Sequence, residues 1–197
     1  MQLKNLPQLF IFTICLFLTS CSNFFNEKNG GLILPDGFEA VVVVDSLPGK
    51  ARHLAVNENG DIYVKGNRFV EGGANFGLRD ENKDGRADII KNFGPKIREG
   101  AYATSMRIHN GYLYTSSEML VYRYKLDAKS MVPMGEPEYI VIDSGRRREH
   151  DGKPLAFDGK GHIFVPFGAP SDACQVENRL PGSPGMLPCP ILDSNAG

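Results

Sequence analysis

A hairpin pattern that recurs three times at a regular spacing limits the folds open to this chain. Residues 54–64, 106–115 and 155–165 each read as a short strand, a tight turn with Asn, Asp or Gly, and a second strand rich in β-branched and aromatic residues. Such a pattern is typical of β-hairpins. The three segments begin about 50 residues apart, and sheet repeats of about 40–50 residues indicate the blades of a β-propeller.

The stretches between the hairpins supply candidate outer strands. Residues 38–45 read as a buried strand, and residues 87–93, 119–126 and 138–142 read as further strands. No segment beyond residue 31 shows a convincing helical period. The sequence therefore predicts an all-β fold, a β-propeller of four-stranded blades, with a β-sandwich or two packed meanders as alternatives.

The predicted blades are too few to close a ring. About three blades fit into this chain of 197 residues, whereas propellers usually close with four to eight blades. Open sheet edges promote aggregation. We therefore expect the chain to be the front half of a longer protein, and assembly of several chains into one ring is the alternative.

The N-terminus reads as an export signal. Residues 9–18 are almost unbroken in their apolar character, which is too short for the roughly 20 residues of a membrane span and suits a signal-peptide core. The run ends in Leu18-Thr19-Ser20-Cys21, which resembles the bacterial lipobox. We predict that residues 1–20 are removed and that Cys21 carries the lipid; an ordinary secretory signal with a chance cysteine is the alternative.

This N-terminus also predicts the organisation and location of the mature protein. Residues 21–31 form a polar, lipidated tether, and residues 32–197 form the incomplete propeller domain. A protein with several acyl chains on Cys21 is firmly anchored to a membrane. We expect an exported lipoprotein, anchored on the periplasmic side or at the cell surface.

Two of the four cysteines remain for a disulfide. Cys15 lies in the signal and Cys21 is consumed by lipid, which leaves Cys174 and Cys189 as an even pair in an oxidising compartment. A bridge closing about 15 residues contributes roughly 3 kcal/mol in the chain-entropy model. A metal pair is less favoured because no histidine stands nearby at ligand spacing.

A second motif predicts a calcium loop. Asp80, Asn82, Asp84 and Asp88 carry oxygens at alternate positions around Gly85, as in the first part of a calcium-binding loop. The twelfth position, where a bidentate glutamate is expected, is Lys91, so the loop is not a standard EF-hand. The alternative is an Asx-rich turn without an ion.

A third motif places a histidine in front of the last hairpin. His150 immediately precedes the predicted inner strand, and in a propeller the loops that enter inner strands open onto the central channel. A neutral histidine there can accept a proton, and Asp151 or Glu149 could orient it. A surface histidine in a polar loop is the alternative that spacing alone favours.

The residues around His150 resemble a known family. The run His150-Asp-Gly-Lys-Pro-Leu-Ala-Phe-Asp158, followed by His162-Ile-Phe-Val-Pro-Phe-Gly168, resembles the glucose/sorbosone dehydrogenases, whose motif is His-Asn-Gly-Gly-x-Leu-x-Phe, then Asp-Gly-x-Leu-Tyr-Val and a glycine. Residues 168–174 and 185–190, and the opening at 34–38, look like the sorbosone dehydrogenase-like branch. These proteins are six-bladed propellers that use pyrroloquinoline quinone (PQQ).

The resemblance implies roles for individual residues. His150 would be the general base that removes the substrate hydroxyl proton while hydride passes to the quinone, and Asp151 stands where the family has asparagine. Lys153 replaces a family glycine. The quinone-clamping basic residues and the calcium that activates the quinone lie mainly in later blades of the family; Arg146, Arg147 and Arg148 could pair with the quinone carboxylates, although they read more readily as a solvated loop.

Three functions follow from these patterns. The first is a quinone-dependent sugar or aldehyde dehydrogenase, with a cytochrome as a possible electron acceptor; it should be inactive without the missing blades. The second is a non-catalytic propeller that binds carbohydrate or protein, and the third is a calcium-dependent, lactonase-type hydrolase. The formal net charge of −1 argues against nucleic acid as a partner.

Overall fold

The structure is a computed structural model of the chain, and it describes residues 29–96, 103–127, 129–143, 150, 152–168 and 173–189. The contacts divide the chain into two units, Met1–Ala40 and Val41–Gly197. In the first unit the described residues, 29–40, form turns and contain no strand. All strands belong to the second unit, which is described below by itself.

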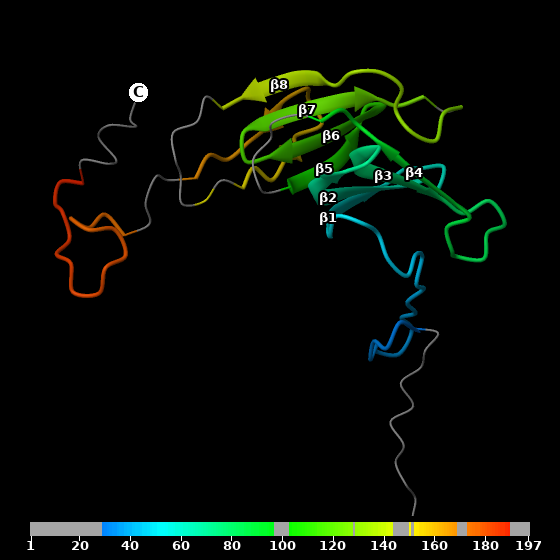
Figure 1. The fold of residues 1–197 in the computed structure, drawn as a ribbon, viewed down its shortest axis with the longest axis horizontal. Helices are drawn as coiled ribbons and strands as arrows, with labels where there is room; N and C mark the ends of the chain where they lie inside the picture. Colours follow the sequence, from blue (N-terminus) through cyan, green and yellow to red (C-terminus); the bar gives the residue numbers. More distant parts are fainter. Residues whose placement is uncertain are drawn as a thin grey trace, which may run out of the picture. The chain divides into compact units, whose positions relative to one another are not determined.

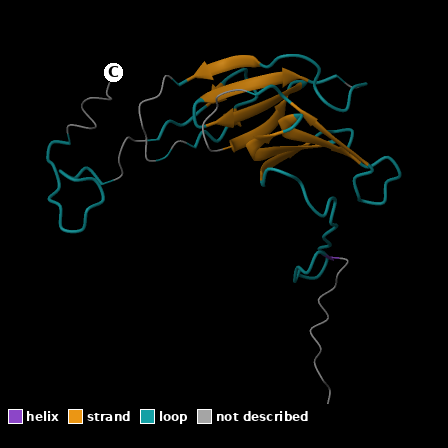
Figure 2. Ribbon diagram, in the orientation of Figure 1, coloured by secondary structure: helices purple, strands orange, loops and turns teal. Residues whose placement is uncertain are grey.

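The second unit is built of antiparallel sheets, with no α-helix among its described residues (Figure 2). Two four-stranded sheets follow the chain order, β1-β2-β3-β4 and β5-β6-β7-β8, and β9 pairs with β10 in a hairpin (Figure 1). The strands are β1 Ala51–Val56, β2 Ile62–Val70, β3 Gly73–Arg79, β4 Ile89–Phe93, β5 Ala103–His109, β6 Tyr112–Ser117, β7 Leu120–Lys125, β8 Glu138–Ile142, β9 Ala156–Phe157 and β10 Ile163–Phe164.

This order is that of propeller blades. Each sheet is a meander whose strands pair with their sequence neighbours, and β1 and β2 of the first sheet contact β5 of the second. The three predicted hairpins are present as β1–β2, β5–β6 and β9–β10. The chain therefore forms a partial β-propeller, with two four-stranded blades and the first hairpin of a third.

The second sheet is buried on both faces. Because side chains alternate along a strand, Leu113 and its cross-strand neighbour Tyr124 face the first sheet, whereas Tyr114 and Arg123 face the third hairpin. The first face forms an aromatic core in which the Phe93 ring lies 5.5 Å from that of Tyr124. Burial in this core raises the pKa of Tyr63 to about 12.

Antiparallel order also divides the blade loops between two ends. We call the end at which β1, β5 and β9 begin the leading end; it includes the β2–β3 and β6–β7 turns. The other is the trailing end, with the β1–β2, β5–β6 and β9–β10 turns and the β3–β4 and β7–β8 loops. Val132 of the β7–β8 loop lies close to Gly77 near the end of β3, so the trailing ends of the two sheets coincide.

The prediction of a buried strand at residues 38–45 is wrong. The segment forms no strand, and Phe38 and Val41 are 70% and 56% exposed. In the second unit Val43 accepts a main-chain hydrogen bond from Ala87, while Val43 and Val44 pack against the core of the first sheet. Apolar composition thus attracts these residues to the sheet without giving them a ladder of main-chain hydrogen bonds.

Candidate functional site

His150 lies at the leading end, just ahead of β9, and is exposed to solvent. Its main chain packs directly on Gly168, which follows β10: a Cβ atom on Gly168 would overlap the carbonyl oxygen of His150. Only glycine fits at this distance. His150, at the start of the motif, and Gly168, at its end, are 18 residues apart in sequence. They are nevertheless neighbours in space.

A fully buried lysine anchors the segment that carries His150. The Lys153 Nζ lies 3.1 Å from the Asp143 carboxylate, where the second blade ends, and the two side chains are 1% and 12% exposed. The same ammonium donates a hydrogen bond to the carbonyl of Glu118 in the β6–β7 turn, and it lies 5.3 Å from the Phe167 ring centroid. A charge this deeply buried needs such partners, so Lys153 binds the segment to the leading end of the second blade.

Two buried serines hold the main chain of the same segment. The hydroxyl of Ser116 donates to the Lys153 carbonyl at 2.6 Å, and the Ser105 hydroxyl accepts the N–H of Leu155 at 3.3 Å. Both serines are buried. The position of the chain next to His150 is thus fixed by contacts with β5, β6 and the β6–β7 turn, although the sequence alone indicates only a polar loop.

The remaining residues predicted for this site fall outside the described residues. Asp151, Glu149 and the arginines at 146, 147 and 148 are among them, so whether they meet His150 stays a prediction. Sequence reasoning missed the Lys153–Asp143 pair, because it treated Lys153 only as a departure from a family glycine.

The predicted calcium loop lies at the trailing end, in the β3–β4 connection. The Asp80 carboxylate accepts main-chain hydrogen bonds from Lys83 and Gly85 at 2.6 and 2.7 Å. The Asn82 side-chain nitrogen lies 3.2 Å from Asp84 Oδ2 and 3.3 Å from Asp88 Oδ1. The four predicted residues therefore curl around one point, in the manner of an Asx-rich turn.

The loop sits beside a charged pair that secures the neighbouring turn. Asp61 is buried in the β1–β2 connection and accepts two hydrogen bonds from Arg79, at 2.7 Å from Nε and 2.6 Å from Nη2. These bonds from the Arg79 guanidinium hold the pKa of Asp61 below its usual value, against the opposing effect of burial. Such bidentate pairing is among the stronger charge-assisted contacts.

No group of three or more His, Cys, Asp or Glu residues is placed to hold a metal within the described ranges. In the Asp80 loop the Asn82 amide nitrogen separates two of the carboxylates, and Asp80 is engaged with the main chain. The converging carboxylates that a metal-dependent, lactonase-type hydrolase needs are thus not found in this part of the chain.

The described residues also contain no helix long and apolar enough to cross a membrane.

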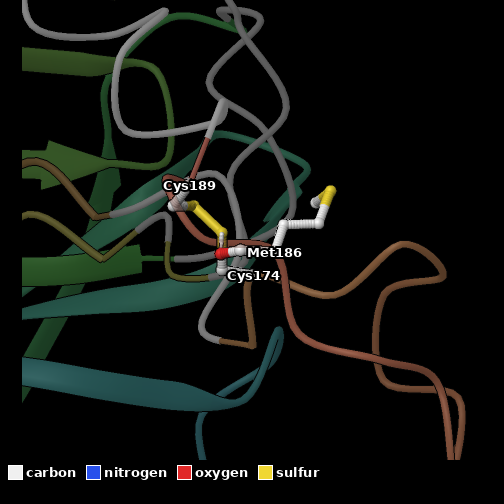
Figure 3. The surroundings of a disulfide bond; sticks show 3 residues. All are labelled: Cys174, Met186 and Cys189. Atoms are coloured by element: carbon white, nitrogen blue, oxygen red, sulfur yellow. Dashed lines mark hydrogen bonds between the residues drawn. A yellow bond between two sulfur atoms is a disulfide. The ribbon is translucent and has the colours of Figure 1, made fainter.

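The predicted disulfide is confirmed. Cys174 and Cys189 are bonded, with their Cα atoms 6.0 Å apart (Figure 3). Within the loop, the Met186 N–H donates to the Cys174 carbonyl at 2.9 Å, and Gln175 forms an isolated bridge with Gly185. The bridge therefore closes a small structured loop after the third hairpin.

Comparison with known proteins supports the fold of this chain and does not identify its family. No protein-family model and no curated protein matches the sequence. Two matching solved structures are the calcium and iodide structures of Trichoderma reesei Carbohydrate-Active Enzymes Family AA12. The first has a TM-score of 0.51 at 13% identity and covers 66% of this chain and 32% of that chain; the second has a TM-score of 0.51 at 12% identity, with 66% and 33% covered.

A third matching structure is the holo form of the PQQ domain of pyranose dehydrogenase from Coprinopsis cinerea, with a TM-score of 0.48 at 16% identity, covering 63% of this chain and 28% of that chain. The chain spans about a third of the length of these structures. At 13% identity the likeness to the AA12 structures concerns the fold, and it agrees with a partial propeller.

Proposed function

We propose that this chain is part of a quinone-dependent sugar or aldehyde dehydrogenase, exported as a lipoprotein, in which His150 accepts the proton of the substrate hydroxyl. The fold supports the general class, because solved structures of carbohydrate-active enzymes share it. The assignment of the base and of the quinone rests on the resemblance of residues 149–190 to the glucose/sorbosone dehydrogenases.

One observation carries the proposal: the main chain of the His150 segment is held at the leading end of the blades. Gly168 contacts the main chain on one side of the motif, and the buried Lys153 secures the other side through Asp143. A general base works only when its ring is held within hydrogen-bond reach of the proton that it removes.

The described residues fit the quinone only in part. The chemistry that PQQ supplies when bound is hydride acceptance, and its carboxylates need cations around them. In the described part of the chain the buried ammonium groups of Lys153 and Lys65 already contact Asp143 and Tyr122. The proposal therefore assigns the carboxylate contacts to the arginines at 146–148, or to residues of later blades, and derives no step through them.

We assign calcium, in the same proposal, to the Asp80 loop. The sequence pattern supports this, because Asp80, Asn82, Asp84 and Asp88 carry side-chain oxygens at calcium-loop spacing. Binding would require the Asn82 amide to turn, because its nitrogen now lies near Asp84 and Asp88 and its oxygen accepts the Asp84 N–H at 2.9 Å. The ion would brace the trailing end and take no part in the chemistry. Calcium binds through such oxygen ligands.

The test of the dehydrogenase uses the full-length protein with added PQQ, a panel of aldoses and sorbosone, and an artificial electron-acceptor dye. His150→Ala should lower the rate of dye reduction by about 10²–10⁴, the usual contribution of a general base. His53→Gln, a change to another histidine on β1, serves as the matched control and should leave the rate unchanged. Equal rates for His150→Ala and the wild type would contradict the assignment of the base.

The lipid anchor is tested separately. Cys21→Ser should release the protein from membranes, because the acylation acceptor is lost, while the wild type incorporates labelled fatty acid. A wild-type protein that takes up no label would refute the anchor without touching the dehydrogenase. Binding of sugar without any quinone-dependent turnover in the full-length protein would instead favour the non-catalytic propeller.

A further inference from the structure

A small pocket opens at the trailing end, on the side of the second blade that faces the third hairpin. Its volume is about 290 Å³, close to the lower limit of roughly 300 Å³ for ligand sites. Two hairpin turns, β5–β6 and β9–β10, and the faces of β6, β7 and β8 contribute the lining. The residues that matter for its chemistry are His109, Asn110, Tyr112, Tyr114, Arg123 and Phe157.

Ring contacts make the walls of this pocket rigid. The His109 ring stacks on Phe157 with centroids 4.3 Å apart and planes 16° apart, and the edge of Tyr114 meets Phe157 at 4.8 Å. Tyr114 and Phe157 also belong to the core between the second blade and the third hairpin. The aromatic surface is therefore built into the packing of the fold and needs no ligand to form.

The charges at the pocket are already balanced. The Arg123 guanidinium donates to Glu138 at 2.7 Å and to the Tyr114 hydroxyl at 2.8 Å, and it lies 4.1 Å from the Tyr112 ring centroid. An anionic ligand would therefore compete with Glu138 for the guanidinium. Arg123 already occupies the position over the Tyr112 ring where a cationic ligand would bind.

Three polar groups of the lining remain available. In the described part of the chain, the Tyr112 hydroxyl, the His109 imidazole and the Asn110 amide make no hydrogen bond, although each belongs to the pocket wall. Asn110 is fixed in the turn by its left-handed backbone, with φ of 47°. Donors and acceptors beside rigid aromatic rings suit a ligand that carries hydroxyl groups and has an apolar C–H face.

We propose that this pocket binds a neutral, polyhydroxylated ligand the size of a single sugar ring. The site is distinct from the His150 site, since the two lie at opposite ends of the blades. It stands on the lining residues alone and does not require the dehydrogenase function. A sugar bound here would be held without being turned over.

The test measures binding to the full-length protein on a His150→Ala background, which prevents turnover from being mistaken for binding. The seven tyrosines of the chain contribute to one emission signal, and the part of a ligand-induced change that Tyr112→Phe removes reports on the pocket. The probes are D-glucose, D-galactose, D-xylose and myo-inositol, each titrated to about 100 mM, a range that covers millimolar dissociation constants. At least one should give a saturable change in emission.

Two pocket variants and one matched control locate the binding. Tyr112→Phe keeps the ring and removes a single hydrogen-bonding group, so it should weaken binding about 3–10-fold; His109→Ala, checked by its melting temperature, should weaken it at least as much. Tyr139→Phe removes a hydroxyl from a 44% exposed tyrosine of β8 outside the pocket and should leave binding unchanged.

Phosphate and choline are the contrasting probes for an anion and a cation. The proposal fails if none of the four neutral probes binds. It also fails if phosphate or choline binds in a way that Tyr112→Phe weakens, while Tyr112→Phe leaves the binding of the neutral probes unchanged. It also fails if Tyr139→Phe weakens binding as much as Tyr112→Phe, because the sugar would then be held elsewhere.

Discussion

Removing the carboxylate from the buried Lys153–Asp143 pair tests whether this pair fixes the His150 segment. In Asp143→Asn the ammonium, which is 1% exposed, keeps the carbonyl of Glu118 but loses the carboxylate oxygen that lies 3.1 Å away. A neutral amide cannot compensate a buried positive charge. The variant should therefore be clearly less stable than the wild type.

The size of the loss follows from burial. Breaking a buried ion pair by removing one partner costs about 3–5 kcal/mol. Because Asp143 retains 12% of its side-chain exposure, water partly screens the pair, and we expect a loss at or just below the lower end of this range, about 2–3 kcal/mol. For a domain of this size each kcal/mol lowers Tm by about 2–4 °C, so the melting temperature should fall by roughly 5–10 °C.

Denaturant titration and calorimetry of the full-length protein measure the effect. The matched control is Asp45→Asn, which breaks the Asp45–Arg86 pair; its N···O distance is 2.7 Å but its side chains are 79% and 51% exposed, so the loss should stay below about 1 kcal/mol. Adding Lys153→Met to Asp143→Asn should recover part of the stability, because the uncompensated charge is gone. Equal losses for Asp143→Asn and Asp45→Asn would refute the reasoning.

Three further predictions concern the trailing end and the disulfide loop. Calcium should raise the Tm of the wild type but not of Asp84→Ala, and a chelator that leaves the wild-type Tm unchanged would show that the loop is only a turn. Since the Arg79 contact lowers the pKa of Asp61 from 3.8, its stabilisation is present above that pH and is lost as the pH falls through the folded-state pKa. The difference in unfolding free energy between the wild type and Asp61→Asn should therefore be largest at pH 7 and shrink as the pH falls below 3.8 in denaturant titrations; a constant difference contradicts this. Replacing Cys174 and Cys189 by serine should increase proteolytic cleavage within the segment between them, mapped by mass spectrometry, and unchanged cleavage would show that the hydrogen bonds of the loop suffice.

The hairpins were predictable because their turns are encoded locally. Gly60 has φ of 91°, and Asn110 and Gly111 have φ of 47° and 75°, values that Gly and Asn tolerate better than other residues. Two strands flanking such a turn are close in sequence, so the loop-closure entropy lost when they pair is small. The spacing of these turns was therefore enough to indicate blades.

Strand β3 was not predicted, because its sequence favours a strand only in context. It contains Gly73 and Gly77, and glycine has a low strand propensity. A Cβ atom on Gly77 would approach the Val132 side chain to 2.7 Å, so the second blade packs where the side chain is missing. The error at residues 38–45 is the converse, because valines there suggest a strand that tertiary structure does not provide with a partner.

The candidate site shows the same limit. The sequence pointed to His150 through a contiguous motif, but the partners of Lys153 come from the end of the second blade and from a turn between its central strands. The trailing-end pocket likewise joins side chains that are up to about 50 residues apart in sequence. Contacts of this range depend on how blades stack, and a single sequence does not contain that information.

The antiparallel order of the strands puts the proposed calcium loop and His150 at opposite ends of the blades. The Asp80 loop follows β3 at the trailing end, whereas the Lys153 contact places the His150 segment at the leading end. A blade strand of five to nine residues spans about 17–30 Å at roughly 3.3 Å per residue, which exceeds the Debye length of about 8 Å at physiological salt. Calcium in the Asp80 loop therefore has little direct influence on a proton transfer at His150. Chelation should lower the melting temperature while leaving the pH dependence of His150-dependent turnover unchanged, and a pH profile that moves with calcium would place the functional ion at the other end of the blades.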